Sequence, residues 1–250
     1  MARTVEDLAL MMNVIARPDA RDWHALPDDG MNYSQALAGG VQGLRIAYIP
    51  QLGNVQVDPE VATAVRDGAK VFENLGAHVE EMDAPFDYPL NLMATLWYTG
   101  AAQVVAGYGP EARARMDPGL LEIAAEGSSY SLMQYLEVTM QRTNLGIRLS
   151  QFHEHFDLLL TPTLPIPAFE AGYEVPQGWP GRRWLSWTPF TYPFNLTQQP
   201  AISVPCGMTT SGLPIGLQLV GAKYKDALVL RAAQTYESSL PMHRRPPGAK

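Results

Sequence analysis

The chain has 250 residues, of which 46% are hydrophobic and 17% are charged, and its formal net charge at pH 7 is -7. This hydrophobic content supplies a core and excludes a disordered chain. Residues 1–125 carry a net charge of -9 and residues 126–250 a net charge of +2, so neither half has the basic field that nucleic acid binding requires.

One long segment carries no charge at all. From Trp184 to Ala222 there are 39 consecutive residues without Asp, Glu, Lys or Arg. Prolines interrupt this segment, and no run of about 18 apolar residues exists, so the sequence predicts no membrane association. The segment is therefore expected to be buried in protein. The single cysteine, Cys206, excludes an internal disulfide, and no secretory signal is visible, so we expect a cytoplasmic protein.

The first half of the chain predicts a helix and then a strand-helix-strand unit. Thr4 is a helix cap before an apolar stripe that runs to Ile15, and residues 17–43 read as a loop. Residues 44–49 alternate as a strand. Asp58 and Pro59 begin a helix that Gly76 ends, and residues 77–82 form the next strand, which the crossover makes parallel to the first.

The second half predicts two helices, three strands and a final helix. Helical patterns cover residues 90–107 and 128–156, followed by a buried strand over 157–162 and a proline-containing loop over 162–183. Strands are expected at 201–205 and 215–220, and a helix at 226–237. The long helical pattern has an apolar series, which comprises Leu132, Leu136, Met140, Ile147, Leu149 and Phe152.

These elements predict an α/β fold with a mixed β-sheet flanked by helices, part of an α/β/α sandwich. We expect one domain over residues 1–238 and a tail over residues 239–250, where three prolines occur.

The residues alone indicate no catalytic apparatus and no cofactor. His153 and His155 point apart on a helix, so no metal site is predicted. Cys206 is interpreted as a small buried hydrophobe, since a nucleophilic cysteine needs a histidine nearby. Ser128, after Gly127, is interpreted as the cap of the long helix rather than as part of a catalytic loop.

Three separated motifs resemble the amidase signature family. They are Met1-Ala2-Arg3-Thr4-Val5-Glu6-Asp7-Leu8, Asp157-Leu158-Leu159-Leu160-Thr161-Pro162-Thr163, and the run from Pro193 to Gly207 followed by Gly212 to Gly221. The resemblance covers the chain from Ala2 to about Glu237. The chain resembles only the C-terminal half of the members of that family. Gln198 departs from it, because many members have glycine there.

The resemblance implies a hydrolase that cleaves C–N bonds of carboxylic amides with a serine nucleophile, a second serine and a lysine base. None of these family residues matches a position in this sequence, so we expect the nucleophile in a missing N-terminal half and no activity from this chain alone. The chain is then a truncated fragment of a longer enzyme.

Five residues beside the uncharged strands are candidates for a substrate cleft, because aromatic side chains with a few polar ones are typical of pockets for small apolar amides. They are Trp187, Phe190, Thr191, Phe194 and Asn195. All five could equally be core residues. The expected partner is a small-molecule amide in the complete enzyme, and we expect self-association or packing with the missing half.

Two further functions stay open. The chain could be a fragment of the A-type subunit of a tRNA-dependent amidotransferase, although relatives of that kind often carry an aspartate where Thr188 stands. It could also be a non-catalytic binding protein derived from the amidase fold.

Overall fold

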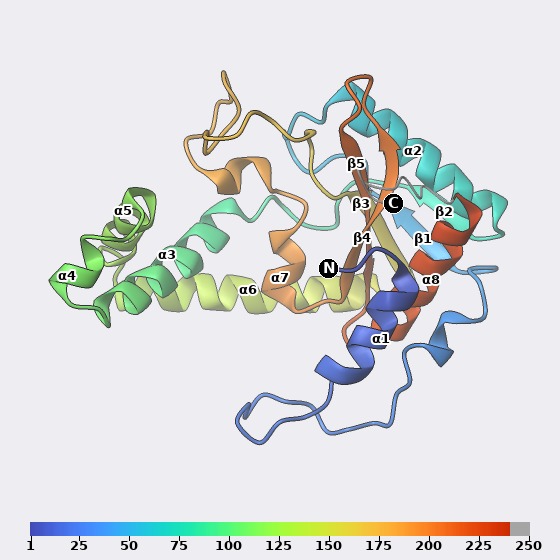
Figure 1. The fold of residues 1–250 in the computed structure, drawn as a ribbon, viewed down its shortest axis with the longest axis horizontal. Coiled ribbons are helices and arrows are strands. Elements are labelled where there is room, and N and C mark those ends of the chain that lie inside the picture. Colours follow the sequence, from blue (N-terminus) through green and yellow to red (C-terminus); the bar gives the residue numbers. More distant parts are fainter. Residues whose placement is uncertain (241–250) are drawn as a thin grey trace, which may run out of the picture.

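The computed structural model describes residues 1–240 and shows a mixed sheet with helices on both faces (Figure 1). The five strands lie in the order β2-β1-β3-β5-β4. β1 runs parallel to β2 and β3, whereas β5 runs antiparallel to β3 and β4. The predicted α/β class and the predicted parallel pair are confirmed. The strands are β1 (Arg45–Tyr48), β2 (His78–Glu81), β3 (Leu158–Pro162), β4 (Ala201–Met208) and β5 (Pro214–Gly221).

The described part of the chain holds eight α-helices and two short 3-10 helices. Three of the α-helices, α4, α5 and α7, were not predicted. The helices are α1 (Val5–Ile15), α2 (Pro59–Asn74), α3 (Leu90–Ala106), α4 (Pro110–Arg113), α5 (Pro118–Gly127), α6 (Leu132–Phe152), α7 (Tyr192–Thr197), α8 (Asp226–Ser239), η1 (Gln35–Leu37) and η2 (Trp184–Trp187).

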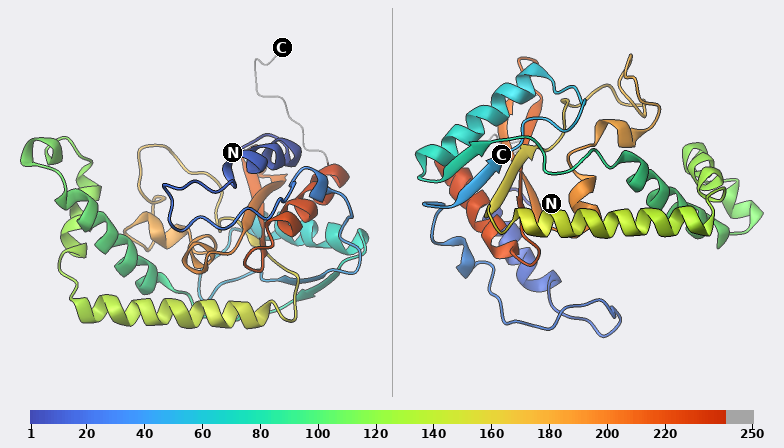
Figure 2. Two further views of the ribbon diagram at one scale, coloured as in Figure 1. Left: turned by 90° about the horizontal axis from the view of Figure 1, so that it is seen from below. Right: turned by 180° about the vertical axis from the view of Figure 1, so that it is seen from behind.

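Alternate residues of the central strands point to opposite faces of the sheet and build two cores. Leu158 and Leu160 enter the first core, which α1, α2 and α8 cover. Leu159 enters the second core, which α3, α6 and α7 cover. Figure 2 shows the two helical layers on either side of the sheet. β3 is buried along its whole length because helices lie on both of its faces.

The predicted helix starts are confirmed where a cap residue precedes the apolar pattern. The Thr4 hydroxyl accepts a hydrogen bond from the Asp7 amide at 3.1 Å. The Asp58 carboxylate accepts one from the Glu60 amide at 2.8 Å. Gly76, just past α2, has a φ of +90°, a conformation that glycine adopts without steric cost.

The long helix was predicted to begin at Ser128, but it begins after Ser131. The Ser131 hydroxyl accepts from the Gln134 amide, and the Gln134 side chain accepts from the Ser131 amide at 2.8 Å, which forms a complete capping box. Gly127 ends α5 instead, and a Cβ there would lie 1.9 Å from the Tyr98 carbonyl oxygen. The glycine therefore allows α5 to pack closely on α3.

The apolar series of the long helix divides between two faces. Leu149 and Phe152 are buried in the second core. Leu132, Met140 and Ile147 are 72%, 61% and 52% exposed. α6 therefore presents apolar side chains to solvent on the side away from the sheet.

The uncharged segment supplies η2, α7, β4 and β5, and its burial is uneven. β5 is buried over most of its length because it lies between β3 and β4. β4 forms the edge of the sheet, and its residues Ala201, Ser203 and Pro205 are exposed on one face. The segment is therefore buried along β5 and exposed on one face of β4, and the expected packing of such a face against a missing half or another copy stays a prediction.

α8 and α1 bring the two ends of the described chain together. Val5 donates its backbone N–H to the Glu237 carboxylate at 3.1 Å, across 232 residues of sequence. α8 extends to Ser239, one residue beyond the predicted domain boundary at 238, and most of the predicted tail lies outside the described residues. Within residues 1–240, no helix combines the length and the apolar character that a membrane crossing needs.

Candidate functional site

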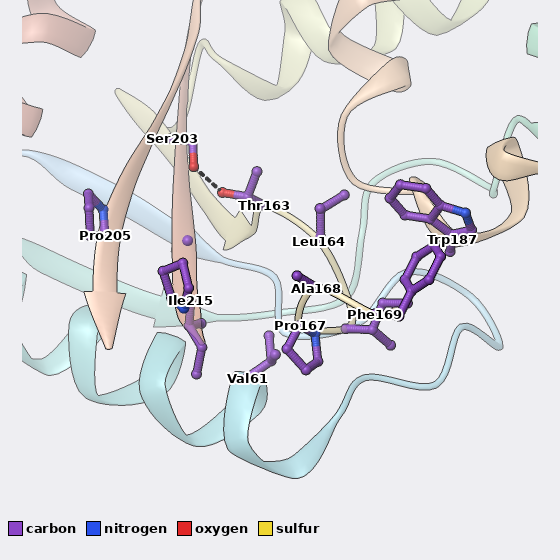
Figure 3. A pocket seen from close by; sticks show the side chains of 13 residues that line it. Val61, Thr163, Leu164, Pro167, Ala168, Phe169, Trp187, Ser203, Pro205 and Ile215 are labelled. Atoms are coloured by element: carbon purple, nitrogen blue, oxygen red, sulfur yellow. Dashed lines mark hydrogen bonds between the residues drawn. The ribbon is translucent and has the colours of Figure 1, made fainter. Parts of the chain in front are cut away.

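A pocket of about 530 Å³ lies at the end of the sheet where β3 ends and β4 and β5 form a hairpin (Figure 3). Most of its lining is apolar and comes from the loop after β3, from the hairpin, from the start of α2 and from η2. The lining residues are Val61, Thr163, Leu164, Ile166, Pro167, Ala168, Phe169, Trp187, Ser203, Pro205, Pro214, Ile215 and Gly216.

Two of the sequence motifs meet in this pocket through a pair of hydroxyl groups. The Thr163 hydroxyl lies 2.7 Å from the Ser203 hydroxyl, although 40 residues separate them (Figure 3). Thr163 also donates its backbone N–H to the Gly216 carbonyl at 3.0 Å, which extends the β3–β5 pairing by one residue. A Cβ on Gly216 would lie 2.7 Å from the Ser203 hydroxyl, so the glycine keeps room for the pair.

The loop after β3 is fixed at two places around the pocket. The Asp58 amide donates to the Pro165 carbonyl at 2.8 Å, which ties the loop to the start of α2. The Phe169 ring contacts the Trp187 ring edge-to-face, with centroids 5.2 Å apart. The Trp187 indole N–H donates to the Glu174 carbonyl at 2.9 Å, which orients the ring against the pocket.

Gln218 holds the segment that carries Trp187, and the sequence reasoning missed it. Its side-chain amide is buried in the sheet and donates to the Phe190 carbonyl at 2.8 Å and to the Thr161 hydroxyl at 2.9 Å. Gln218 is the one strongly polar residue in the apolar run from Ile215 to Val220, and that isolation was the available signal. A buried amide in a strand needs partners, because leaving it unpaired costs free energy.

The structure separates the five predicted cleft residues. Trp187 lines the pocket, whereas Phe190 and Phe194 are buried together in the second core. The Thr191 hydroxyl donates to the Thr188 carbonyl at 3.1 Å. Asn195 is exposed and donates its side-chain amide to the Thr191 carbonyl at 3.1 Å. Their role in substrate binding stays a prediction.

The polar groups of the site are not arranged as an activated nucleophile. Ser203 is paired with Thr163, and among the described residues no lysine or histidine side chain hydrogen-bonds to a serine or threonine. Burial raises the pKa of the Cys206 thiol to about 12, so it stays protonated at neutral pH. Residues 1–240 contain no cluster of His, Cys, Asp and Glu that could hold a metal ion.

A second, more polar pocket of about 750 Å³ lies between α3, α5 and the loop before η2. Tyr98, Glu126 and Arg183 are among its lining residues, and Arg183 forms an ion pair with Glu122 at 3.1 Å. We take the first pocket as the candidate site because two of the motifs line it.

Comparison with known proteins identifies the family to which this α/β sandwich belongs. The family model described as Amidase matches residues 1–230. The chain belongs to the amidase signature family.

The similar proteins include an acylamidase and a subunit of an amidotransferase. The acylamidase of Rhodococcus erythropolis is 34% identical over 247 residues, which cover 96% of this chain and 52% of the relative. The A-type subunit of the glutamyl-tRNA(Gln) amidotransferase of Myxococcus xanthus is 32% identical over 275 residues, with coverages of 98% and 55%.

The solved structures agree with these relatives. A bacterial aryl acylamidase superposes with a TM-score of 0.83 at 29% identity, over 96% of this chain and 52% of that one. A 6-aminohexanoate cyclic dimer hydrolase with bound substrate has a TM-score of 0.83 at 26% identity, over 98% and 55%. The chain therefore spans about half the length of the relatives it matches.

Proposed function

We propose that the chain supplies the C-terminal part of an amidase-type hydrolase, which cleaves the C–N bond of carboxylic amides with a serine nucleophile located outside these 250 residues. The observation that carries the proposal is the Amidase match over residues 1–230. The unactivated Ser203–Thr163 pair supports it, because amide hydrolysis by serine needs a base at hydrogen-bond distance from the attacking hydroxyl.

The lining of the candidate site favours an amide with an apolar acyl or aryl group. Its walls are aliphatic and aromatic, with Trp187 and Phe169 on one side and the hydroxyl pair on the other. Pockets of this kind bind apolar groups and orient them with few polar contacts. The names of the similar acylamidases agree with this substrate class.

The second candidate is the A-type subunit of a tRNA-dependent amidotransferase, which the Myxococcus xanthus relative supports. Thr188 is buried, and its hydroxyl lies 3.4 Å from the Leu185 carbonyl that accepts from it. Relatives of that kind often carry an aspartate at this position, so the neutral threonine counts against the second candidate. This position therefore favours the acylamidase type of substrate.

The free edge of β4 is the surface on which we propose that the remaining part of the hydrolase packs. Gly221 donates to the Pro200 carbonyl at 3.0 Å. This bond makes Pro200 and Gly221 a hydrogen-bonded pair of the β4–β5 ladder. Because bonded and non-bonded pairs alternate along an antiparallel ladder, Ala201 and Ser203 belong to non-bonded pairs, and their backbone N–H and C=O groups point away from β5. No strand within residues 1–240 pairs with this edge. An uncharged edge strand of eight residues is suited to strand addition.

The test of this function is an amidase assay on the purified chain, alone and co-expressed with the N-terminal part of the Rhodococcus erythropolis acylamidase. We expect no hydrolysis of an aryl anilide by the chain alone and measurable hydrolysis by the pair. Ala201→Pro removes an outward N–H and should abolish complementation, whereas Ala201→Val should retain it. Hydrolysis by the chain alone that is lost in Ser203→Ala would overturn the proposal.

A further inference from the structure

The exposed face of α6 has the residue spacing of a helix-helix seam. Side chains at alternating intervals of three and four residues lie on one face of the helix, which is the spacing of the a and d positions of a heptad. The six positions are Met133, Leu136, Met140, Thr143, Ile147 and Ser150. All six are exposed, and none is charged. They cover roughly 26 Å of helix at 1.5 Å per residue.

This face is on the outside of the molecule. α6 packs on the second core through Leu145, Leu149 and Phe152, which point to the opposite side of the helix. α6 runs along one margin of the ribbon with no other element of residues 1–240 beyond it (Figure 2, left). Met133 and Met140 are 72% and 61% exposed. Contiguous exposed apolar surface of this kind marks an interaction site.

The hydroxyl groups on this face are already satisfied within the helix. Thr143 donates to the Thr139 carbonyl at 3.1 Å, and Ser150 donates to the Gly146 carbonyl at 2.9 Å. Thr139, at the margin of the face, donates to the Tyr135 carbonyl at 2.8 Å. Burying these hydroxyls therefore leaves no donor without a partner, and the whole face can be desolvated.

We propose that this face binds the same face of a second copy of the chain, with the two α6 helices antiparallel about a two-fold axis. The axis passes between Met140 and Thr143. Each large side chain then lies opposite a smaller or equal one of the partner copy: Met133 opposite Ser150, Leu136 opposite Ile147, and Met140 opposite Thr143.

The antiparallel arrangement gives layers of similar volume. A parallel pair would put each residue opposite itself, so the Met133, Leu136 and Met140 layers would be crowded and the Ser150 layer nearly empty. Cores of such uneven volume pack poorly. The face is self-complementary only when one copy is reversed. A seam of this length is smaller than a standard interface, so we expect a dissociation constant in the micromolar range.

The first test measures the association of the 250-residue chain between 1 and 100 µM by sedimentation velocity. We expect a monomer-dimer equilibrium in the wild type. Met140→Glu and Thr143→Lys should each weaken the dimer by at least 100-fold. An equimolar mixture of the two variants should recover most of the association, because the carboxylate introduced in one copy then faces the ammonium group introduced in the other.

The matched control is Val104→Glu on α3, since Val104 is 61% exposed, as Met140 is, but lies outside the seam. This variant should dimerise like the wild type, and circular dichroism should show that all variants fold. A monomeric wild type at 100 µM would overturn the proposal. Equal association of Met140→Glu and Val104→Glu would overturn it too, because the contact would then lie elsewhere, for example at the β4 edge.

Oxidative cross-linking in a Cys206→Ala background tests whether the two α6 helices are antiparallel. Leu136→Cys mixed with Ile147→Cys should give a disulfide-linked dimer, and Leu136→Cys alone should not. A cross-link formed by Leu136→Cys alone would show a parallel pair and overturn the antiparallel seam.

Discussion

Replacing Gln218 tests whether one buried amide positions the segment beside the candidate pocket. Gln218 is 4% exposed and donates to the Phe190 carbonyl at 2.8 Å and to the Thr161 hydroxyl at 2.9 Å. Gln218→Met keeps nearly the same volume and removes both donors. The Phe190 carbonyl then loses this donor, whereas the Thr161 hydroxyl keeps its bond to the Pro162 carbonyl at 2.8 Å.

The expected loss follows from these contacts. A buried acceptor left without its donor costs about 1–3 kcal/mol. The second lost hydrogen bond adds roughly 1 kcal/mol to this cost, and burial of the apolar methionine side chain offsets part of the total. We expect the free energy of unfolding to fall by about 2 kcal/mol, which corresponds to roughly 4–8 °C in melting temperature for a chain of this size.

Urea denaturation followed by circular dichroism measures this change, with an unchanged dependence on urea concentration as the sign that only stability has changed. Thr161→Val should cost roughly 1 kcal/mol, and the double variant should lose less than the sum, because both changes break the same bond. A loss below about 0.5 kcal/mol in Gln218→Met, or full additivity, would refute the positioning role.

Four further changes test other features. Gln198 has a φ of +60°, so Gln198→Gly should raise the free energy of unfolding by about 0.5–1 kcal/mol in urea melts; a loss would contradict the strain. Gly216→Ala should destabilise the chain, and adding Ser203→Ala should restore part of the loss, since the new Cβ would lie 2.7 Å from the Ser203 hydroxyl. Ser131→Ala should cost about 1 kcal/mol through the lost cap of α6, measured by helix signal on heating. Burial lowers the pKa of His153 below its ordinary value of 6.5, so the unfolded chain binds the proton more readily. Stability should therefore be complete above pH 6.5 and fall as the pH drops below it, and His153→Phe should flatten this slope in melts at pH 5–7.

The elements that the sequence predicts well are those whose pattern is local. Asp58 and Gly76 mark both ends of α2, and the continuously apolar sequence of β3 predicts that both faces of this strand are covered. The antiparallel pairing of β4 and β5 was not stated from the sequence, although the short turn between the two strands is the signal for it.

The features that the sequence did not predict depend on contacts between distant segments. The sequence gives no reason for a glycine at position 127 other than a loop. The reason is that a Cβ there would lie 1.9 Å from the backbone carbonyl oxygen of Tyr98. The approach of Thr163 to Ser203 depends on the register of three strands. Helical spacing on α6 is two-sided, so periodicity alone could not say that Leu149 and not Met140 faces the core.

The hydrogen bond between the Val5 amide and the Glu237 carboxylate has a consequence for the order of assembly during synthesis. α1 is synthesised before its partner α8, which is translated more than 200 residues later. Likewise, β3 cannot pair with its neighbour β5, nor β1 with its neighbour β3, until the later strand has been translated. Contacts of such long sequence separation form slowly. α1 is therefore made long before it can pack, and the nascent chain exposes the apolar side of α1 until α8 has been translated.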